Sequence, residues 1–420
     1  MSHFPEHSSK ELTSHFFRSE YGKLVAVITR YLGNNNVQTA EDIVQETLLK
    51  ATEHWEIKGV PENPKAWLYT TAKNLSLNIL KRQKYQRDYA SSMPDKQLSE
   101  QVIPFSEELI ADSQLKMMFA CCHESIPENS QIALVLKILS GFSIGEIADA
   151  FFSNRETINK RLVRGRKQLR QLNLEIHDKA VLNQRLDAVL KIIYLLFNEG
   201  YLPSSKNQVI RFDLCLEAIR LAQLLEHSDI ISQKTEVYAL LSLMYFNVSR
   251  FQSRVSEKGE IIDLKEQDRT LWDMESIQTG SQYLQLATES AVVSKYIIMA
   301  TISANHCVST SYQTTNWIQI LTLYDQLLKL EASPIIHLNR AVALAEVEGY
   351  QSALESLQQL GESTDINNYF LYYFTLAELY KKNRQLGRAQ EAYHKALQLA
   401  NNPRDKELLQ KKLDFLVPDL

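Results

Sequence analysis

The sequence predicts an all-α protein, with long helices joined by short loops and a helical-repeat region toward its C-terminal end. Chain-breaking residues are scarce: 12 glycines and 10 prolines make 22 of 420 residues, about 5%, where average usage is near 12%. Apolar side chains recur at helical spacing through most of the chain. The length suggests two or three domains, and the composition disfavours a turn-rich sheet protein or a disordered chain.

Three helices are expected in the N-terminal part. In 16–33, apolar side chains recur three and four residues apart until a Gly-Asn-Asn-Asn run ends the segment. Residues 40–55 follow, with Thr39 as the expected N-cap. A proline-marked turn then leads into a long helix over 63–87.

Charge distinguishes the second helix from the third. Residues 41–62 carry six acids and two lysines, whereas 73–87 carry five basic residues and no acid. The basic segment is interleaved with aromatic side chains, which suits melting or single-stranded DNA because bases stack on rings while the backbone follows the charge. An acidic helix beside a basic one favours a protein partner for the first and a nucleic acid for the second.

Residues 88–110 form a polar segment without periodicity, which predicts a linker. Residues 141–170 predict a helix-turn-helix, in which Ser153 or Asn154 caps the second helix. Residues 153–170 hold seven basic residues and one acid. Early polar side chains of such a helix read base edges, and later cations contact phosphates. The alternative is a solvated basic helix face. The DNA-contacting candidates are Arg155, Thr157, Asn159, Lys160, Arg161, Arg164, Arg166 and Lys167.

Helical periodicity continues from about residue 185 to the end, and the last part contains a weak internal repeat. Ala341 and Ala353 correspond to Ala377 and Ala389 at an offset of 36 residues. Small residues at these spacings let antiparallel helices pack closely, and a period near 34 is typical of tetratricopeptide (TPR) repeats. A generic helical bundle is the alternative.

Other polar clusters point less clearly to a site. The adjacent Cys121 and Cys122 could not easily both bind one metal ion, so no metal site is expected. Glycine-rich phosphate loops and hydrolase motifs are absent from the sequence, so neither a cofactor nor an enzyme is expected. Two clusters fit either a small-ligand pocket or ordinary caps and inter-helix hydrogen bonds: they comprise Asn198 and Glu199, and Gln267, Asp268, Arg269 and Trp272.

The chain resembles the extracytoplasmic-function (ECF) RNA polymerase sigma factors of a subgroup with a long TPR-like extension. Residues matching the two sigma domains include AEDIVQETLLKA, PKAWLYTTAKNLSLNILKRQ and NRETINKRLVRGRKQL. Segments typical of the subgroup include FACCHESIP, IIYLLFNEGYLPSS, RFDLCLEAIRLAQLL, EQDRTLWD and PIIHLNRAVALAEVEG. The resemblance spans about residues 14–415.

The resemblance implies a domain order and site residues. Sigma domain two covers 10–90, a linker 91–110, sigma domain four 111–175 and the extension 180–420. Contacts with the promoter −10 element are implied for Trp67, Lys73, Asn74, Asn78, Lys81 and Arg82. Contacts with the clamp helices of the polymerase β′ subunit are implied for Asp42, Val44, Gln45, Glu46 and Leu49.

The expected partners are therefore core RNA polymerase, through its β′ and β subunits, and promoter DNA. Residues 1–175 carry a net charge of +1 (22 basic, 21 acidic) and the remainder −5 (24 and 29), so an acidic extension could contact the sigma domains and modulate them. The N-terminal residues have early acids and no apolar core, so no signal peptide is expected and the protein is placed in the bacterial cytoplasm, away from membranes. A helix-turn-helix regulator that works without polymerase, and a TPR scaffold that binds only proteins, are the alternatives.

Overall fold

The computed structural model describes residues 9–90, 106–151, 153–172, 179–201, 210–256, 261–290, 292–363, 365–400 and 403–416. Helices dominate this part of the chain and no strand forms in it, apart from an isolated antiparallel bridge between Val255 and Ile261. The predicted all-α fold is confirmed. None of the helices in the described ranges is long and apolar enough to cross a membrane.

The chain folds into two units. One comprises residues 1–205 and 210–234, and the other comprises 206–209 and 235–420.

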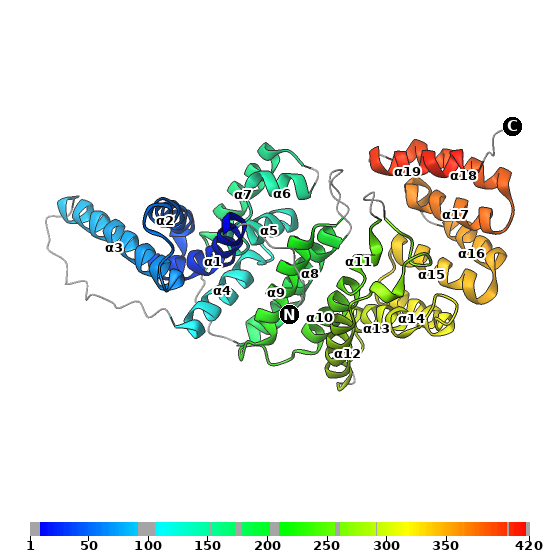
Figure 1. Ribbon diagram of the computed structural model, residues 1–420, viewed down its shortest axis with the longest axis horizontal. Coiled ribbons are helices and arrows are strands. Elements are labelled where there is room, and N and C mark those ends of the chain that lie inside the picture. Colours follow the sequence, from blue (N-terminus) through cyan, green and yellow to red (C-terminus); the bar gives the residue numbers. More distant parts are fainter. Residues whose placement is uncertain are drawn as a thin grey trace. The chain divides into compact units, whose positions relative to one another are not determined.

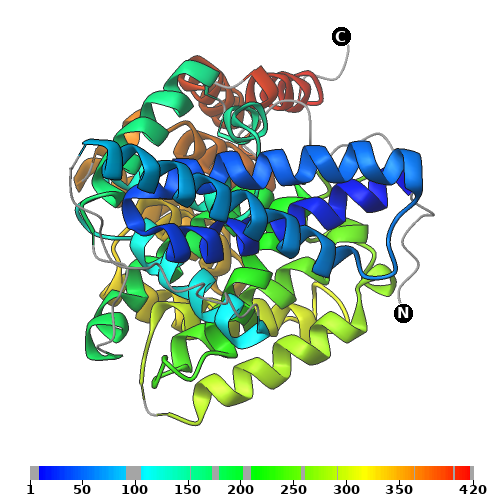
Figure 2. The same cartoon turned by 90° about the vertical axis from the view of Figure 1, so that its left-hand side faces the viewer.

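The first unit begins with three helices that contact one another: α1 (Ser9–Leu32), α2 (Val37–Lys58) and α3 (Pro64–Ala90). Figures 1 and 2 show them side by side in shades of blue. Apolar side chains such as Leu24, Val44 and Leu68 are fully buried there. The expected N-cap at Thr39 is wrong, because a short helical turn η1 (Asn34–Asn36) leads directly into α2 and leaves Thr39 inside the helix.

The next elements are α4 (Glu107–Cys121), α5 (Glu128–Leu134), the π-helical turn η2 (Val135–Leu139), α6 (Ile144–Ala150) and α7 (Arg155–Leu169). Helix α4 begins inside the segment expected to be a linker, because the Ser106 side chain accepts a hydrogen bond from the backbone N–H of Leu109. The rest of that linker, 91–105, lies outside the described residues. Helices α6 and α7 form the predicted helix-turn-helix, with a capping box on α6 and Asn154 as the N-cap of α7.

Helices α8 (Lys179–Tyr201) and α9 (Phe212–Glu226) belong to the same unit and form a hairpin. Helix α8 contacts α4 and α5, and α9 contacts α4. Gly200 allows the hairpin to close, since a Cβ there would lie 2.6 Å from the Cys215 Sγ and 2.9 Å from the Arg211 carbonyl oxygen. The Arg211 backbone N–H also donates to the Gly200 carbonyl at 2.7 Å.

The second unit starts with α10 (Thr235–Val248), α11 (Phe251–Arg254), η3 (Arg269–Leu271), α12 (Met274–Thr288), α13 (Lys295–Val308) and α14 (Trp317–Leu330). Helix α10 packs on α12 and α13. The close packing of α10 on α12 depends on Gly280, which lies against the Phe246 ring and whose carbonyl accepts a 2.8 Å hydrogen bond from Ser242.

Stacked helix pairs complete this unit: α15 (Pro334–Glu348), α16 (Tyr350–Ser363), η4 (Asp365–Asn368), α17 (Phe370–Lys382), α18 (Leu386–Leu399) and α19 (Pro403–Asp414). The repeated alanines Ala341, Ala353, Ala377 and Ala389 are each at most 1% exposed and belong to one apolar core. The predicted TPR-like packing is therefore confirmed, with α15–α16 and α17–α18 as the two copies (Figure 1).

Candidate nucleic-acid interface

Helix α7 has one buried apolar face and one exposed basic face. Its buried face comprises Ile158, Leu162, Gly165 and Leu169. Gly165 lets α7 approach α5 closely, because a Cβ there would lie 2.8 Å from a methyl carbon of Leu134. Because this face of α7 packs against the rest of the unit, the polar side chains on the opposite face point outward.

The exposed face of α7 contains most of the residues predicted to contact DNA. Arg155, Asn159, Lys160, Arg164 and Lys167 are exposed, and Thr157 and Arg161 are half-buried. Lys160 pairs with Glu156 at 2.7 Å, but both side chains are 76% exposed, so water screens this pair strongly. The face therefore has a net positive charge and can approach phosphates.

Arg166 is separate from that face. Its guanidinium makes two hydrogen bonds of 2.9 Å to the carboxylate of Glu41 on α2. The two side chains are only 14% and 4% exposed. Arg166 was predicted to contact DNA, but Glu41 engages two of its donors, Nε and Nη2, and only 14% of the arginine side chain is exposed.

Helix α3 carries a second polar stripe. Asn74, Asn78, Lys81 and Arg82 are exposed, and their spacing of four, three and one residues places them on one side of the helix. Lys73 is half-buried. The side chains of Lys84 and Arg87, which belong to the same predicted basic cluster, lie outside those that the structure describes.

Aromatic rings lie near the start of the same helix. Trp67 is half-buried, stacks on His54 with ring centroids 5.5 Å apart and meets Trp55 edge-on at 5.7 Å. Trp55 in turn lies 5.3 Å from Phe17. Trp67 is thus held by neighbouring rings while part of its surface stays accessible.

Helix α2 presents a continuous exposed stripe. Asp42, Gln45, Glu46 and Leu49 follow helical spacing and are all exposed, with Leu49 at 59%. Val44, predicted with them, lies in the core with no exposed surface. The outward set is acidic with one large apolar side chain, which fits a protein partner.

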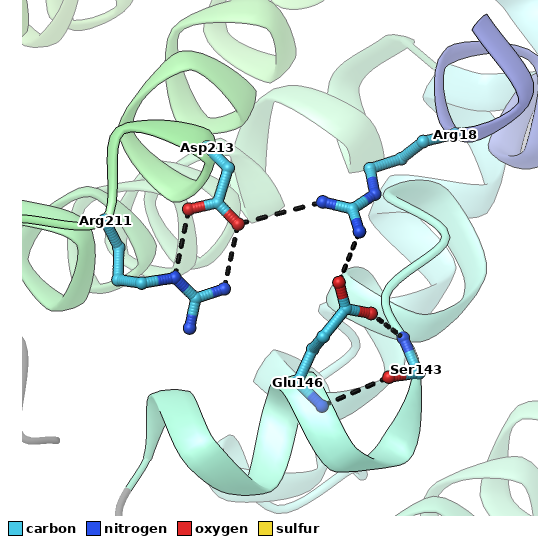
Figure 3. A network of polar contacts seen from close by, with 5 residues as sticks. All are labelled: Arg18, Ser143, Glu146, Arg211 and Asp213. Carbon is cyan, nitrogen blue, oxygen red and sulfur yellow. Dashed lines mark hydrogen bonds and ion pairs between the residues drawn. The ribbon is translucent and has the colours of Figure 1, made fainter. Parts of the chain in front are cut away.

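A polar junction joins three helices that are distant in the sequence. Figure 3 shows the Arg18 guanidinium of α1 between the carboxylates of Glu146 on α6 and Asp213 on α9. Arg18 pairs with Glu146 and lies 3.7 Å from Asp213. Asp213 also accepts two hydrogen bonds from Arg211, at 3.0 and 2.8 Å.

Glu146 is held in its charged form. Burial opposes ionisation, but hydrogen bonds from Ser143 and the Arg18 guanidinium keep the pKa of Glu146 below its usual value. The Ser143 backbone N–H donates to the Glu146 carboxylate at 2.8 Å, which closes the capping box of α6. One carboxylate therefore both caps the helix-turn-helix and binds α1.

The residues of this junction and the Glu41–Arg166 pair were missed by the sequence reasoning. Glu41 had a detectable signal, since it falls on the same helical face as Val37, Ala40 and Val44, which are all buried. A carboxylate on an apolar helix face needs a buried partner. Arg18 gave no comparable signal, because its partner Glu146 is 128 residues away.

The polar clusters of the extension make structural hydrogen bonds. Gln267 donates to the Ile262 carbonyl at 3.0 Å, and Asp268 accepts from the Thr270 backbone at 2.9 Å. Arg269 lies over the Trp272 ring at 4.5 Å and donates to two carbonyls at the end of α13. Asn198 and Glu199 lie in the last turns of α8, in the other unit. The interpretation as caps and helix contacts accounts for the Gln267–Trp272 cluster.

A metal centre has no support in the described ranges, where no group of three or more His, Cys, Asp or Glu side chains could hold an ion. The four cysteines form no disulfide and are all buried. Burial raises the pKa of the Cys121 and Cys307 thiols, so they are poor ligands and poor nucleophiles.

Family models match three segments of the chain, and two of these segments lie in its N-terminal part. Residues 16–85 match Sigma-70 region 2, residues 116–169 match Sigma-70 region 4, and residues 185–288 match a family of unknown function (DUF6596).

Similar proteins agree with these matches. An uncharacterized protein of Rhizobium meliloti (strain 1021) is 31% identical over 408 residues, which cover 94% of this chain and 93% of that protein. The ECF RNA polymerase sigma factor SigW of Bacillus subtilis (strain 168) is 28% identical over 162 residues, 36% of this chain and 82% of SigW. SigL of Mycobacterium tuberculosis, also an ECF RNA polymerase sigma factor, is 27% identical over 148 residues, 34% of this chain and 81% of SigL.

The named sigma factors align with only about a third of the chain, while the Rhizobium protein aligns with nearly all of it. The sigma regions lie in the first unit together with the helix-turn-helix and its basic face, and a long helical extension follows them. The chain belongs to the ECF RNA polymerase sigma factors, in the form that carries a long C-terminal helical extension.

Proposed function

We propose that three exposed surfaces of this sigma factor, on α2, α3 and α7, each bind a different target. A sigma factor binds core RNA polymerase and promoter DNA and is not itself an enzyme. In our assignment the α2 stripe docks on the β′ clamp helices, the α3 stripe with Trp67 meets the −10 element as it melts, and the exposed face of α7 reads the −35 major groove. The separation of an acidic stripe from two polar or basic ones carries this assignment.

The proposed domains follow the same division. Sigma domain two covers 10–90, the linker 91–110, sigma domain four 111–175 and the extension 180–420, which modulates activity. Contacts with the β subunit, contacts between the extension and the sigma domains, and action in the bacterial cytoplasm are parts of the proposal.

Polymerase docking is tested by a pull-down with purified core RNA polymerase. The double reversal Asp42→Lys/Glu46→Lys should abolish binding, because it places two cations on the acidic stripe. The matched control is Glu355→Lys/Glu391→Lys, which reverses two exposed acids of α16 and α18 and should leave binding unchanged. Binding that survives the first reversal would refute the docking assignment.

DNA recognition is tested by binding of duplex promoter DNA at several salt concentrations. Lys167→Ala should weaken binding to all sequences and reduce the salt slope by about 0.9 per lost phosphate contact. Asn159→Ala should instead relax the preference for one base pair, by about 1–3 kcal/mol. The control is Lys395→Ala, an exposed lysine of α18. A helix-turn-helix regulator independent of polymerase would bind this DNA but fail the pull-down.

A further inference from the structure

The segment 261–272, which lies between α11 and α12, contacts helices that come much later in the chain. Its C-terminal end is fixed by Arg269, whose guanidinium donates to the carbonyls of His306 and Ser309 at 2.5 and 2.6 Å. Arg269 also lies over the Trp272 ring at 4.5 Å. Because carbonyls at a helix C-terminus are favourable partners of a cation, the end of α13 anchors this part of the segment.

The preceding part of the segment is a turn, in which the Glu266 backbone N–H donates to the Asp263 carbonyl at 2.8 Å. Two charged side chains of the turn contact different parts of the stacked helices. The Asp263 carboxylate lies 3.9 Å from the Lys412 ammonium of α19. Lys265 lies over the ring of Tyr312, in the loop after α13, at 5.5 Å.

The residue between these two charges is apolar. Leu264 packs against an apolar cluster that includes Phe246 of α10 and Cys307 of α13. The turn therefore presents an acid, an apolar side chain and a lysine, in consecutive positions, to three separate partners. These partners come from the first helices of the unit and from its last helix.

The groups that meet the two charges are held by residues outside the turn. The Tyr312 hydroxyl donates to the Glu346 carboxylate of α15 at 3.0 Å. Lys412 pairs with Glu378 of α17 at 3.1 Å, and Glu378 also accepts a hydrogen bond from Tyr393 of α18. Because a site that is already ordered loses little entropy on binding, these groups form a preorganised surface for a ligand.

The turn is held less firmly than its anchor. The Asp263 side chain is 72% exposed and lies at the outer limit of an ion pair with Lys412, so water screens this pair strongly. Lys265 is also exposed, and a cation–π contact is weak at an exposed site. A competing segment can therefore replace the contacts of the turn while Arg269 keeps its bonds to α13.

We propose that Lys412, Tyr312 and the apolar cluster beside Cys307 form a peptide-binding site, which the turn of residues 263–266 occupies until a segment of a partner protein displaces it. The partner segment carries an acid, an apolar residue and a lysine or arginine in consecutive positions. Arginine suits this site as well as lysine does, because a guanidinium stacks on an aromatic ring. The site uses none of the residues assigned to polymerase or promoter, and it gives the extension a class of partner that the proposed function leaves open.

The test uses a fluorescent synthetic peptide that copies residues 261–268 (IIDLKEQD), and measures its binding to the full-length chain by anisotropy. In the wild type the tethered turn competes at an effective concentration on the order of millimolar. The double variant Asp263→Ala/Lys265→Ala removes the competing charges and should bind the peptide at least tenfold more tightly. The matched control is Glu266→Ala, which changes an exposed acid of the same turn and should bind the peptide as the wild type does.

Further variants, made in the background of the double variant, locate the site. Lys412→Ala and Tyr312→Ala should each weaken peptide binding at least fivefold, because each removes the partner of one charge. Lys395→Ala, which changes an exposed lysine of α18, is the matched control and should have no effect. A peptide with its aspartate and lysine exchanged (IIKLDEQD) should bind at least tenfold less tightly.

Backbone hydrogen exchange gives a second measurement that needs no peptide. In the otherwise unchanged chain, Lys412→Ala should speed exchange of the Glu266 amide at least threefold, because the turn is then less firmly held. The amides of α13 should keep their protection, which shows that the unit remains folded.

Equal peptide binding by the wild type and the double variant would overturn the proposal, since the turn would then not compete. Absence of binding by the double variant would overturn it as well. Binding that ignores Lys412→Ala and Tyr312→Ala, or that tolerates the exchanged charges, would place the peptide elsewhere and refute the assigned site. Unchanged exchange of the Glu266 amide in Lys412→Ala would show that α19 does not hold the turn.

Discussion

Replacing Gly22 by alanine should separate region 2 from region 4. The added Cβ would lie 1.9 Å from the Leu139 carbonyl oxygen and 2.5 Å from its carbon, where ordinary contact begins at 3.4 Å. Helix α1 must therefore retreat from η2 by about 1.5 Å (3.4 − 1.9), since a backbone carbonyl cannot rotate away as a side chain can. Such overpacking costs about 1–3 kcal/mol or more, and the helix propensity of alanine returns at most about 1 kcal/mol.

The net cost falls on the packing of region 2 against region 4, so a difference near 2 kcal/mol would lower the ratio of packed to separated regions roughly thirtyfold. Two measurements check it. One is urea unfolding of the full-length chain, and the other is the distance between spin labels attached through Thr52→Cys on α2 and Gln171→Cys after α7, two exposed positions. Gly387→Ala is the matched control, because a Cβ there meets no atom within 4 Å. If Gly22→Ala changes neither the distance nor the unfolding transition, the close approach of α1 to η2 does not hold the regions together.

Three further results are expected. Glu41→Gln should destabilise the first unit by about 3–5 kcal/mol in urea unfolding, because it leaves Arg166 as a buried unpaired charge. His306→Phe should remove a pH dependence: burial and the nearby cations Arg250 and Arg269 lower the pKa of His306 to about 3, so only the unfolded chain gains this proton below about pH 6.5. The unfolding free energy should then fall by up to about 1.4 kcal/mol per pH unit between pH 6 and 4 in the wild type, and less steeply in the variant. Gly165→Ala should weaken DNA binding by tilting α7, measured by anisotropy of a labelled duplex.

Each of these has a contrary outcome. A loss well under 1 kcal/mol for Glu41→Gln would mean that water reaches the pair. Equal pH slopes for His306→Phe and the wild type would mean that His306 is solvated in the folded chain. The matched control is His227→Phe, which replaces an exposed histidine. Unchanged DNA affinity in Gly165→Ala would mean that α5 yields to the added methyl group.

The sequence predicted best where packing is local. Ala341, Ala353 and their partners 36 residues later contact helices adjacent in the chain, so spacing alone identified the helix pairs. The helix-turn-helix was found for the same reason, because the predicted cap at Asn154 acts within one turn of its helix. The residues of the α2 and α3 stripes came instead from the family resemblance, which also included the buried Val44.

The sequence predicted least where partners are distant. Arg166 looked like a phosphate contact because it stands in a basic run, and only the fold brings Glu41 to it across 125 positions. The Arg18 junction has the same character, since its three helices meet through tertiary packing. Helical spacing determines which side of a helix is apolar, but it does not determine which neighbour that side meets.

The family match over residues 185–288 crosses the boundary between the two units, with α8 and α9 on one side and α10 and α12 on the other. Helices α8 and α9 cover parts of α4 and α5, so a chain cut after region 4 would bare apolar surface to water and tend to aggregate. The first helices of the extension therefore belong to the same folded unit as the sigma regions. A shortened protein that keeps this unit intact should end after residue 234 rather than after residue 175.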